Sequence, residues 1–104
     1  MIIKAQSTQR KQSLVYPAME YQTYDESLAL VAEAQYNLAL SYANGEGVIQ
    51  DDVYAHMWWN ISAANGHSLA KEIRDKVSPL MTSSQLTEAQ KLARECVAKD
   101  YKGC

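Results

Sequence analysis

Apolar residues recur along most of the chain at the three- and four-residue steps of amphipathic helices. The first such stretch covers residues 27–43 and is followed at once by Asn44-Gly45. Asn or Gly at that point can adopt the left-handed backbone that ends a helix. The pattern therefore predicts a one-sided helix over 27–43. Its stripe consists of Leu28, Val31, Ala32, Gln35, Leu38, Ala39 and Tyr42.

Three further helices are predicted downstream, each with its own start or stop signal. The second begins at Asp51 or Asp52, because a carboxylate there can accept the free N–H groups of the first turn. The third covers 68–78 and ends before Pro79. The fourth follows Thr82 and Gln85, which have capping-box spacing. The predicted stripes are Ala55, Trp58, Trp59, Ser62 and Ala63 in the second helix, Leu69, Ala70, Ile73 and Val77 in the third, and Leu86, Ala89, Ala93, Cys96 and Val97 in the fourth.

The first 26 residues follow the helical pattern poorly. Residues 6–13 are nearly all polar, and residues 14–16 form a short apolar patch before Pro17. Because proline is favoured at the first position of a helix, a short helix or turn over 18–24 is predicted. We expect residues 1–26 to be partly disordered or to cap the helices that follow, through Met19, Tyr21 and Tyr24.

Composition narrows the class of protein. A chain of 104 residues corresponds to one domain, and its 47% hydrophobic and 21% charged residues are ordinary for a globular protein. Ten basic residues against twelve acidic ones give a net charge of −2, which disfavours nucleic acid as a partner. No apolar run is long enough to span a membrane. No apolar leader segment is present in this sequence, and the compartment stays open: the cytoplasm if the chain is complete, or the periplasm if a signal was removed.

The chain resembles itself at an offset of 34–36 residues. Ala34 corresponds to Ala70, residues 55–58 correspond to 89–92, and residues 63–64 correspond to 97–98. Units of this length are the size of stacking helix–loop–helix repeats.

A family resemblance is carried by residues 32–70. The run from Ala32 to Val48 (AEAQYNLALSYANGEGV) is followed by Asp51, Ala55, Trp58, Ala63-Ala64 and Gly66. This arrangement resembles the Sel-one-like repeat (SLR), a relative of the tetratricopeptide repeat (TPR). One departure is Ala39, where the family usually has glycine. The resemblance implies structural roles for Ala34, Leu38, Tyr42, Gly45, Gly47, Ala55, Trp58, Ala63 and Gly66.

The resemblance implies an all-α fold of αα-hairpin repeats, a fragment of a right-handed solenoid. Residues 27–66 would form the repeat hairpin, and residues 67–104 a divergent capping hairpin. The cap is divergent because Arg74 and Ser78 fall where Leu38 and Tyr42 stand in the first unit.

For function, the resemblance implies a module that binds a peptide or protein partner on a concave helical face. Removing the core stripe from the first helix leaves Glu33, Tyr36, Asn37, Leu40 and Asn44 as candidate binding residues. Tyrosine suits such a surface because it offers a large contact area at low entropy cost. An alternative is that these residues pack against the N-terminal segment or against a second copy, so that the chain is a self-associating unit or a piece of a longer SLR scaffold. Stacked repeats usually need three or more units, and this chain has about one and a half.

Catalytic and metal sites have little support. His56 and His67 are the only histidines, and we interpret them as a surface residue and a helix-start residue. No nucleophile, phosphate loop or metal-ligand motif stands at a recognisable spacing, so we expect no catalytic residue, cofactor or metal. Cys96 and Cys104 are eight residues apart. A disulfide in an oxidising compartment and a pair of free thiols, one half-buried and one terminal, both remain open.

Overall fold

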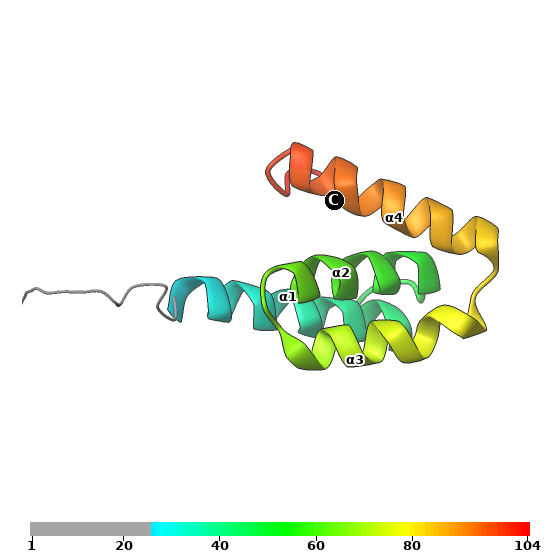
Figure 1. Ribbon diagram of the computed structural model, residues 1–104, viewed down its shortest axis with the longest axis horizontal. Helices are drawn as coiled ribbons and strands as arrows, with labels where there is room; N and C mark the ends of the chain where they lie inside the picture. The colour runs from blue at the N-terminus through cyan, green and yellow to red at the C-terminus, as the bar shows by residue number, and fades with distance from the viewer. Residues whose placement is uncertain (1–25) are drawn as a thin grey trace, which may run out of the picture.

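The computed structural model describes residues 26–104, and within them every regular element is a helix (Figure 1). The all-α fold is therefore as predicted. The elements are α1 (Glu26–Asn44), α2 (Asp52–Ala64), α3 (Ser68–Val77), the short 3-10 helix η1 (Ser78–Leu80) and α4 (Ser83–Ala98). The predictions for residues 1–25, including the helix over 18–24, lie outside the described residues.

Helix α2 lies at the centre of the fold and packs against α1, α3 and α4 (Figure 1). The sequence pattern assigns this helix a single apolar face, which is wrong. His56, Met57 and Ile61 are buried as well as the predicted Trp58 and Trp59. A helix with neighbours on three sides has almost no solvent face, so its side chains must be apolar or hydrogen-bonded all round.

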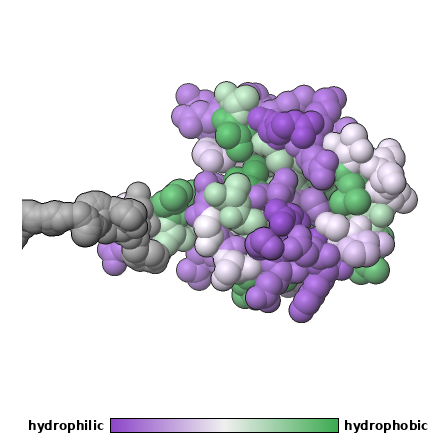
Figure 2. Space-filling view, viewed as in Figure 1, coloured by the Kyte–Doolittle hydropathy of each residue, from purple (hydrophilic) through white to green (hydrophobic). Residues whose placement is uncertain are grey.

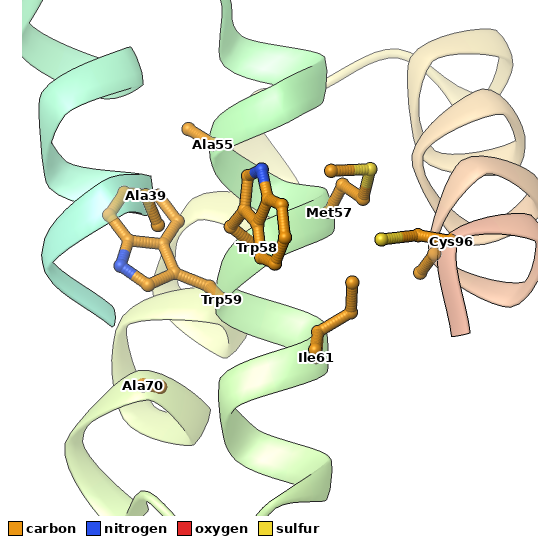
Figure 3. Close-up of a cluster of buried hydrophobic side chains, with 9 residues drawn as sticks. Ala39, Ala55, Met57, Trp58, Trp59, Ile61, Ala70 and Cys96 are labelled. Atoms are coloured by element: carbon orange, nitrogen blue, oxygen red, sulfur yellow. The ribbon is translucent and has the colours of Figure 1, made fainter. Parts of the chain in front are cut away.

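The core is built outward from α2 (Figure 3). The ring of Trp59 extends toward Ala39 of α1, whereas Met57 and Ile61 point toward Cys96 of α4. Ala70 provides the contact from α3. Small residues on the outer helices let their backbones approach the large side chains of α2. The central helix therefore supplies most of the buried side-chain volume.

Helix α1 is buried along a narrow line formed by Ala32, Gln35 and Ala39. The predicted wider stripe is wrong at Leu28 and Val31, whose exposed fractions are 44% and 45%. The reason is that α1 packs closely against α2 alone and its first turns project past that helix (Figure 1). Leu69 of α3 and Val97 of α4 are exposed for a similar reason, since each of these helices packs mainly on α2.

Two polar contacts join α1 to α2 within the core. The hydroxyl of Ser62 donates to the backbone oxygen of Ala32 at 2.6 Å, and both residues are buried. The side-chain amide of Asn65 donates to Oε1 of Gln35 at 2.9 Å. These bonds satisfy polar atoms that would otherwise be costly to bury, and they fix the position of α1 relative to α2 along the helix axes.

The loops carry the predicted capping chemistry. Asp51 accepts from the backbone N–H of Tyr54 at 3.0 Å and so caps α2. Thr82 and Gln85 form the predicted capping box at the start of α4. Gly45, with φ of +70°, occupies the left-handed region, and an added Cβ would stand 3.3 Å from Cβ of Gln50. Glycine at this position therefore allows both the backbone conformation and the close return of the loop.

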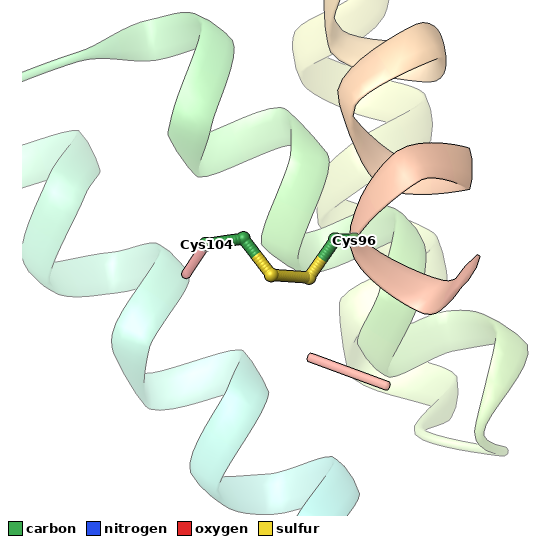
Figure 4. The surroundings of a disulfide bond; sticks show 2 residues. All are labelled: Cys96 and Cys104. Carbon is green, nitrogen blue, oxygen red and sulfur yellow. A yellow bond between two sulfur atoms is a disulfide. The ribbon is translucent and has the colours of Figure 1, made fainter. Parts of the chain in front are cut away.

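The two cysteines are joined by a disulfide (Figure 4). Cys96 is buried at the end of α4, and Cys104 packs against the edge of the core. Between them the chain makes a tight reversal in which Asp100 and Tyr101 both have positive φ. The backbone N–H of Tyr101 donates to the oxygen of Cys96 at 2.8 Å. The bridge thus holds the last residues of the chain against the end of α4.

Residues 67–104, which the sequence assigns to a divergent capping hairpin, form α3, η1 and α4. Helices α3 and α4 each pack on α2, and α2 lies between them in the view of Figure 1. Their packing against each other is much slighter than their packing on α2. Arg74 and Ser78, the polar residues that set this unit apart from the first, make side-chain contacts with Asn60 and His56 of α2.

Candidate functional site

The five candidate binding residues lie on α1 and fall into two groups. Glu33, Asn37 and Asn44 are exposed. Tyr36 and Leu40 are half-buried and pack against the core. The apolar pair expected to be free for a partner therefore also contributes to folding.

Tyr36 is fixed by His67, which lies in the turn between α2 and α3. The two rings stack with centroids 4.6 Å apart and planes 13° from parallel. His67 in turn caps α3, because its Nδ1 accepts from the backbone N–H of Ala70 at 3.1 Å. The half-buried tyrosine ring is thus stacked on a residue whose own side chain is fixed by the start of α3.

Beside this stack lies a cleft of about 370 Å³ between the first half of α1 and the turn that joins α2 to α3. Glu33 and His67 stand on opposite sides of it. The turn contributes to the cleft although no periodic pattern marks it; Asn65-Gly66 has the residue types that end helices and is the sequence signal of its position. The remaining lining residues are Leu28, Ala29, Ala32, Asn65, Gly66 and Ser68.

The residues to which the resemblance assigns structural roles occupy different environments in the fold. Ala55 and Trp58 are buried, and Leu38, Tyr42 and Ala63 pack at the edge of the core. Gly45, Gly47 and Gly66 have positive φ. Ala34, to which the resemblance assigns a structural role, is exposed. Ala70, the counterpart of Ala34 in the second unit, is buried because α3 follows a hairpin on which it can pack.

His56 is buried, which corrects its interpretation as a surface residue. Its Nε2 lies 2.9 Å from Oγ of Ser78. The only hydroxyl proton of Ser78 is donated to the backbone oxygen of Arg74 at 2.7 Å. Ser78 must therefore accept from Nε2–H of His56, and the neutral histidine carries its proton on Nε2. Its Nδ1 is buried without a hydrogen-bond partner.

The surroundings of His56 favour the neutral imidazole. Burial lowers the pKa of His56 below the ordinary value of 6.5, and the guanidinium of Arg74 lowers the pKa further. The carboxylate of Asp75 acts in the opposite direction, but more weakly. Asp75 is itself held ionised, because its hydrogen bonds with Arg74 lower the pKa of its carboxyl.

The lowered pKa of His56 predicts a loss of stability in acid. The unfolded chain binds a proton near pH 6.5, whereas the folded chain resists it, so the free energy of unfolding falls as the pH drops below about 6.5. The slope attributable to one such group is at most about 1.4 kcal/mol per pH unit. A His56→Gln variant removes this titration. The free energy of unfolding, measured with urea, should therefore fall less between pH 7.5 and pH 5 for the variant than for the native chain. Equal losses in the two proteins would contradict the assignment.

Within residues 26–104, no three His, Cys, Asp or Glu side chains are arranged to hold a metal ion. None of the described helices has the length and apolar character needed to cross a membrane.

The fold and loop chemistry define a class, the helical-hairpin repeat proteins. Within that class, residues 32–67 match the family model of the Sel1 repeat. The chain thus contains a Sel1 repeat, formed by α1, α2 and the turn that joins them, and ending at His67. No curated protein and no solved structure matches the chain. Sel1 repeat domains are generally modules for protein interaction.

Proposed function

We propose that this protein binds a peptide or protein partner on the surface of α1 that faces the turn between α2 and α3. The observation that carries the proposal is the cleft beside the stacked Tyr36 and His67 rings. A rigid aromatic edge next to a cavity offers contact area without the entropy cost of ordering a free side chain. Asn37, one turn beyond Glu33, and Asn44, at the far end of α1, are exposed on the same helix and supply further hydrogen-bonding groups.

The charge of this surface indicates the kind of partner. Glu33 is the only charged residue among the five candidates and lines the cleft. Neither the first nor the last turn of α1 carries a basic residue, and the helix as a whole has none. A partner segment that presents an apolar or aromatic side chain next to a basic one would complement the cleft in both shape and charge.

We also propose that the chain has no catalytic activity. Among residues 26–104, Ser78 and His56 form a pair that resembles a nucleophile and its base, but the hydrogen bond between them runs from the histidine to the serine. The serine proton is bonded to a backbone oxygen, and the histidine donates rather than accepts. A general base must accept the proton of its nucleophile.

Self-association is a second candidate function. Leu30 and Val31, on the first half of α1, are exposed by 69% and 45%. Exposed large aliphatic side chains that are close together on a helix are typical of surfaces that meet a partner. A second copy of the chain could cover them without any foreign protein.

One photocrosslinking experiment separates these candidates. A benzophenone amino acid placed at Asn37, which is exposed on α1, should give an adduct with a foreign protein when irradiated in the cells that make this chain. The same group at Glu88, exposed on α4, serves as the matched control and should give none. The purified partner should then bind a Glu33→Ala variant about three- to tenfold more weakly, with the melting temperature unchanged.

Two results would contradict the proposal. An adduct at Asn37 of twice the 11.6 kDa chain mass would indicate self-association in its place. Equal yields at Asn37 and Glu88 would show that α1 is not the preferred surface.

A further inference from the structure

The slight packing between α3 and α4 leaves a groove over α2 on a part of the surface that the proposed function does not use. Two cavities of about 260 and 390 Å³ make up this groove, and both are lined by Asn60 of α2. We refer to the two cavities together as the Asn60 groove. One is polar and the other is mostly apolar, so the groove presents two different chemistries side by side.

The polar cavity is organised around Arg74. Its guanidinium donates to Oδ1 of Asn60 at 2.9 Å and to Oδ1 of Asp75 at 3.0 and 3.1 Å. These contacts engage three of its five N–H groups, so one hydrogen on each terminal nitrogen remains for a ligand. The side chain of Arg74 is 24% exposed, which leaves it accessible from solvent.

Further donors surround the guanidinium. With Oδ1 of Asn60 occupied by Arg74, the amide nitrogen of Asn60 is free of protein partners. Gln90 contributes a second amide from α4, where it is exposed. The one carboxylate among the lining residues, that of Asp75, is paired with Arg74 and with Lys71, which lies outside the cavity. The cavity thus combines a guanidinium that has two free N–H groups with amide donors from two helices.

The apolar cavity continues from Asn60 along the far halves of α2 and α4. Its floor includes the buried side chains of Ile61 and Ala93, and Val97 stands exposed at its edge. Arg94 adds a second positive charge on its rim. On the face shown in Figure 2, apolar side chains are scattered among polar ones.

We infer that the Asn60 groove binds a peptide segment in which a carboxylate stands next to an apolar side chain. The carboxylate would lie on the free N–H groups of Arg74, with amide donors from Asn60 and Gln90, while the apolar side chain would fill the cavity over Ile61 and Ala93. Bonds between a guanidinium and a carboxylate are among the strongest hydrogen bonds available to a protein surface. A peptide fits better than a fatty acid, because the apolar cavity is an open groove rather than an enclosed tunnel, and because the amide donors match peptide carbonyls.

The test is a titration of the full chain followed by ¹H–¹⁵N NMR. Acetyl-Glu-Leu-amide supplies a side-chain carboxylate, and acetyl-Gln-Leu with a free C-terminus supplies a terminal one. At least one of them should shift the Arg74 Nε–H and the side-chain amide signals of Asn60 and Gln90 in a saturable way, and whichever binds more tightly identifies the source of the carboxylate. The neutral acetyl-Gln-Leu-amide should bind at least about tenfold more weakly.

Two variants test the location without removing a residue that supports the fold. Gln90→Glu places a negative charge in the polar cavity and should weaken binding of the acidic peptide about threefold to fivefold. Lys91→Gln changes the net charge by the same amount on the adjacent residue, outside both cavities, and should leave binding nearly unchanged.

A third variant tests the charged contact itself. Arg74→Gln should abolish the preference for the acidic over the neutral peptide.

The inference would be overturned by equal affinity for the charged and neutral peptides, by equal effects of Gln90→Glu and Lys91→Gln, or by octanoate binding more tightly than either peptide. None of these outcomes depends on the α1 surface, so the two proposals succeed or fail separately.

Discussion

A Trp58→Ala variant should lose about 3–5 kcal/mol of unfolding free energy, which is the usual cost of removing a buried aromatic side chain. Trp58 is only 6% exposed and belongs to the core cluster that joins α2 to its neighbours. A domain of this size has a total stability of roughly 5–15 kcal/mol, so the variant should be unfolded or close to unfolding at 37 °C. Urea unfolding followed by circular dichroism measures the difference.

A second substitution at the same position refines this expectation. The indole Nε1 of Trp58 is buried without a hydrogen-bond partner, so replacing the ring by phenylalanine removes an unsatisfied donor as well as some volume. Trp58→Phe should therefore cost much less than Trp58→Ala. Leu80→Ala is the matched control, because Leu80 is a large apolar residue exposed by 84% and should tolerate truncation. An alanine variant at Trp58 that unfolds at the same urea concentration as the native chain would disprove the packing assignment.

Opening the disulfide should produce the second large effect. A bridge that closes a loop of this length stabilises a protein by about 2–3 kcal/mol through the restriction of the unfolded chain. The Cα atoms of Cys96 and Cys104 are 5.8 Å apart, and the bridge holds a turn in which Asp100 and Tyr101 both have positive φ. A Cys104→Ala variant should lose this amount, because it breaks the bridge and leaves the Cys96 thiol in the core, where a small apolar group fits.

The control for this prediction is the reductant itself. Dithiothreitol should lower the melting temperature of the native chain to that of Cys104→Ala, and it should not change the variant. If the native chain melts at the same temperature with and without reductant, the bridge contributes nothing to stability.

Local chemistry made much of the fold predictable from the chain. Asp51 and Thr82 start helices because their side chains accept from nearby backbone N–H groups, and Gly45 allows the left-handed backbone that follows α1. These contacts join residues within a few positions of one another, so short sequence motifs are enough to predict them. The Sel1 repeat was recognisable for the same reason, since its pattern consists of loop glycines and spaced alanines over residues 32–67.

The environment of individual side chains was less predictable, because it depends on how many neighbours each helix has. Periodicity alone predicted one buried face for α2 and a surface position for His56. In the fold, three helices pack around α2, and His56 is almost completely buried. The same periodicity marked Leu28 and Val31 as core, although α1 has close packing on one side only. Amphipathic spacing indicates that one face of a helix is apolar. It does not indicate whether another helix among the described residues packs against that face.

The candidate sites, too, were predictable from the sequence only in part. The sequence singled out Tyr36 and Leu40 as the apolar pair of a binding surface, and only the fold revealed that Tyr36 stacks on His67. For the Asn60 groove, the sequence held one usable clue: Arg74 and Ser78 depart from the first unit at the positions of Leu38 and Tyr42. Those two residues line the polar cavity together with Asn60 and Gln90.

The sequence by itself thus determined the helices, their caps, the repeat and the class of protein, because each of these depends on contacts between residues close together in the chain. Only the tertiary structure decided which apolar stripes are covered, that Cys96 meets Cys104, and that α3 and α4 lie apart over α2. The physical reason is that these features depend on the number and placement of neighbouring helices, which no single segment encodes.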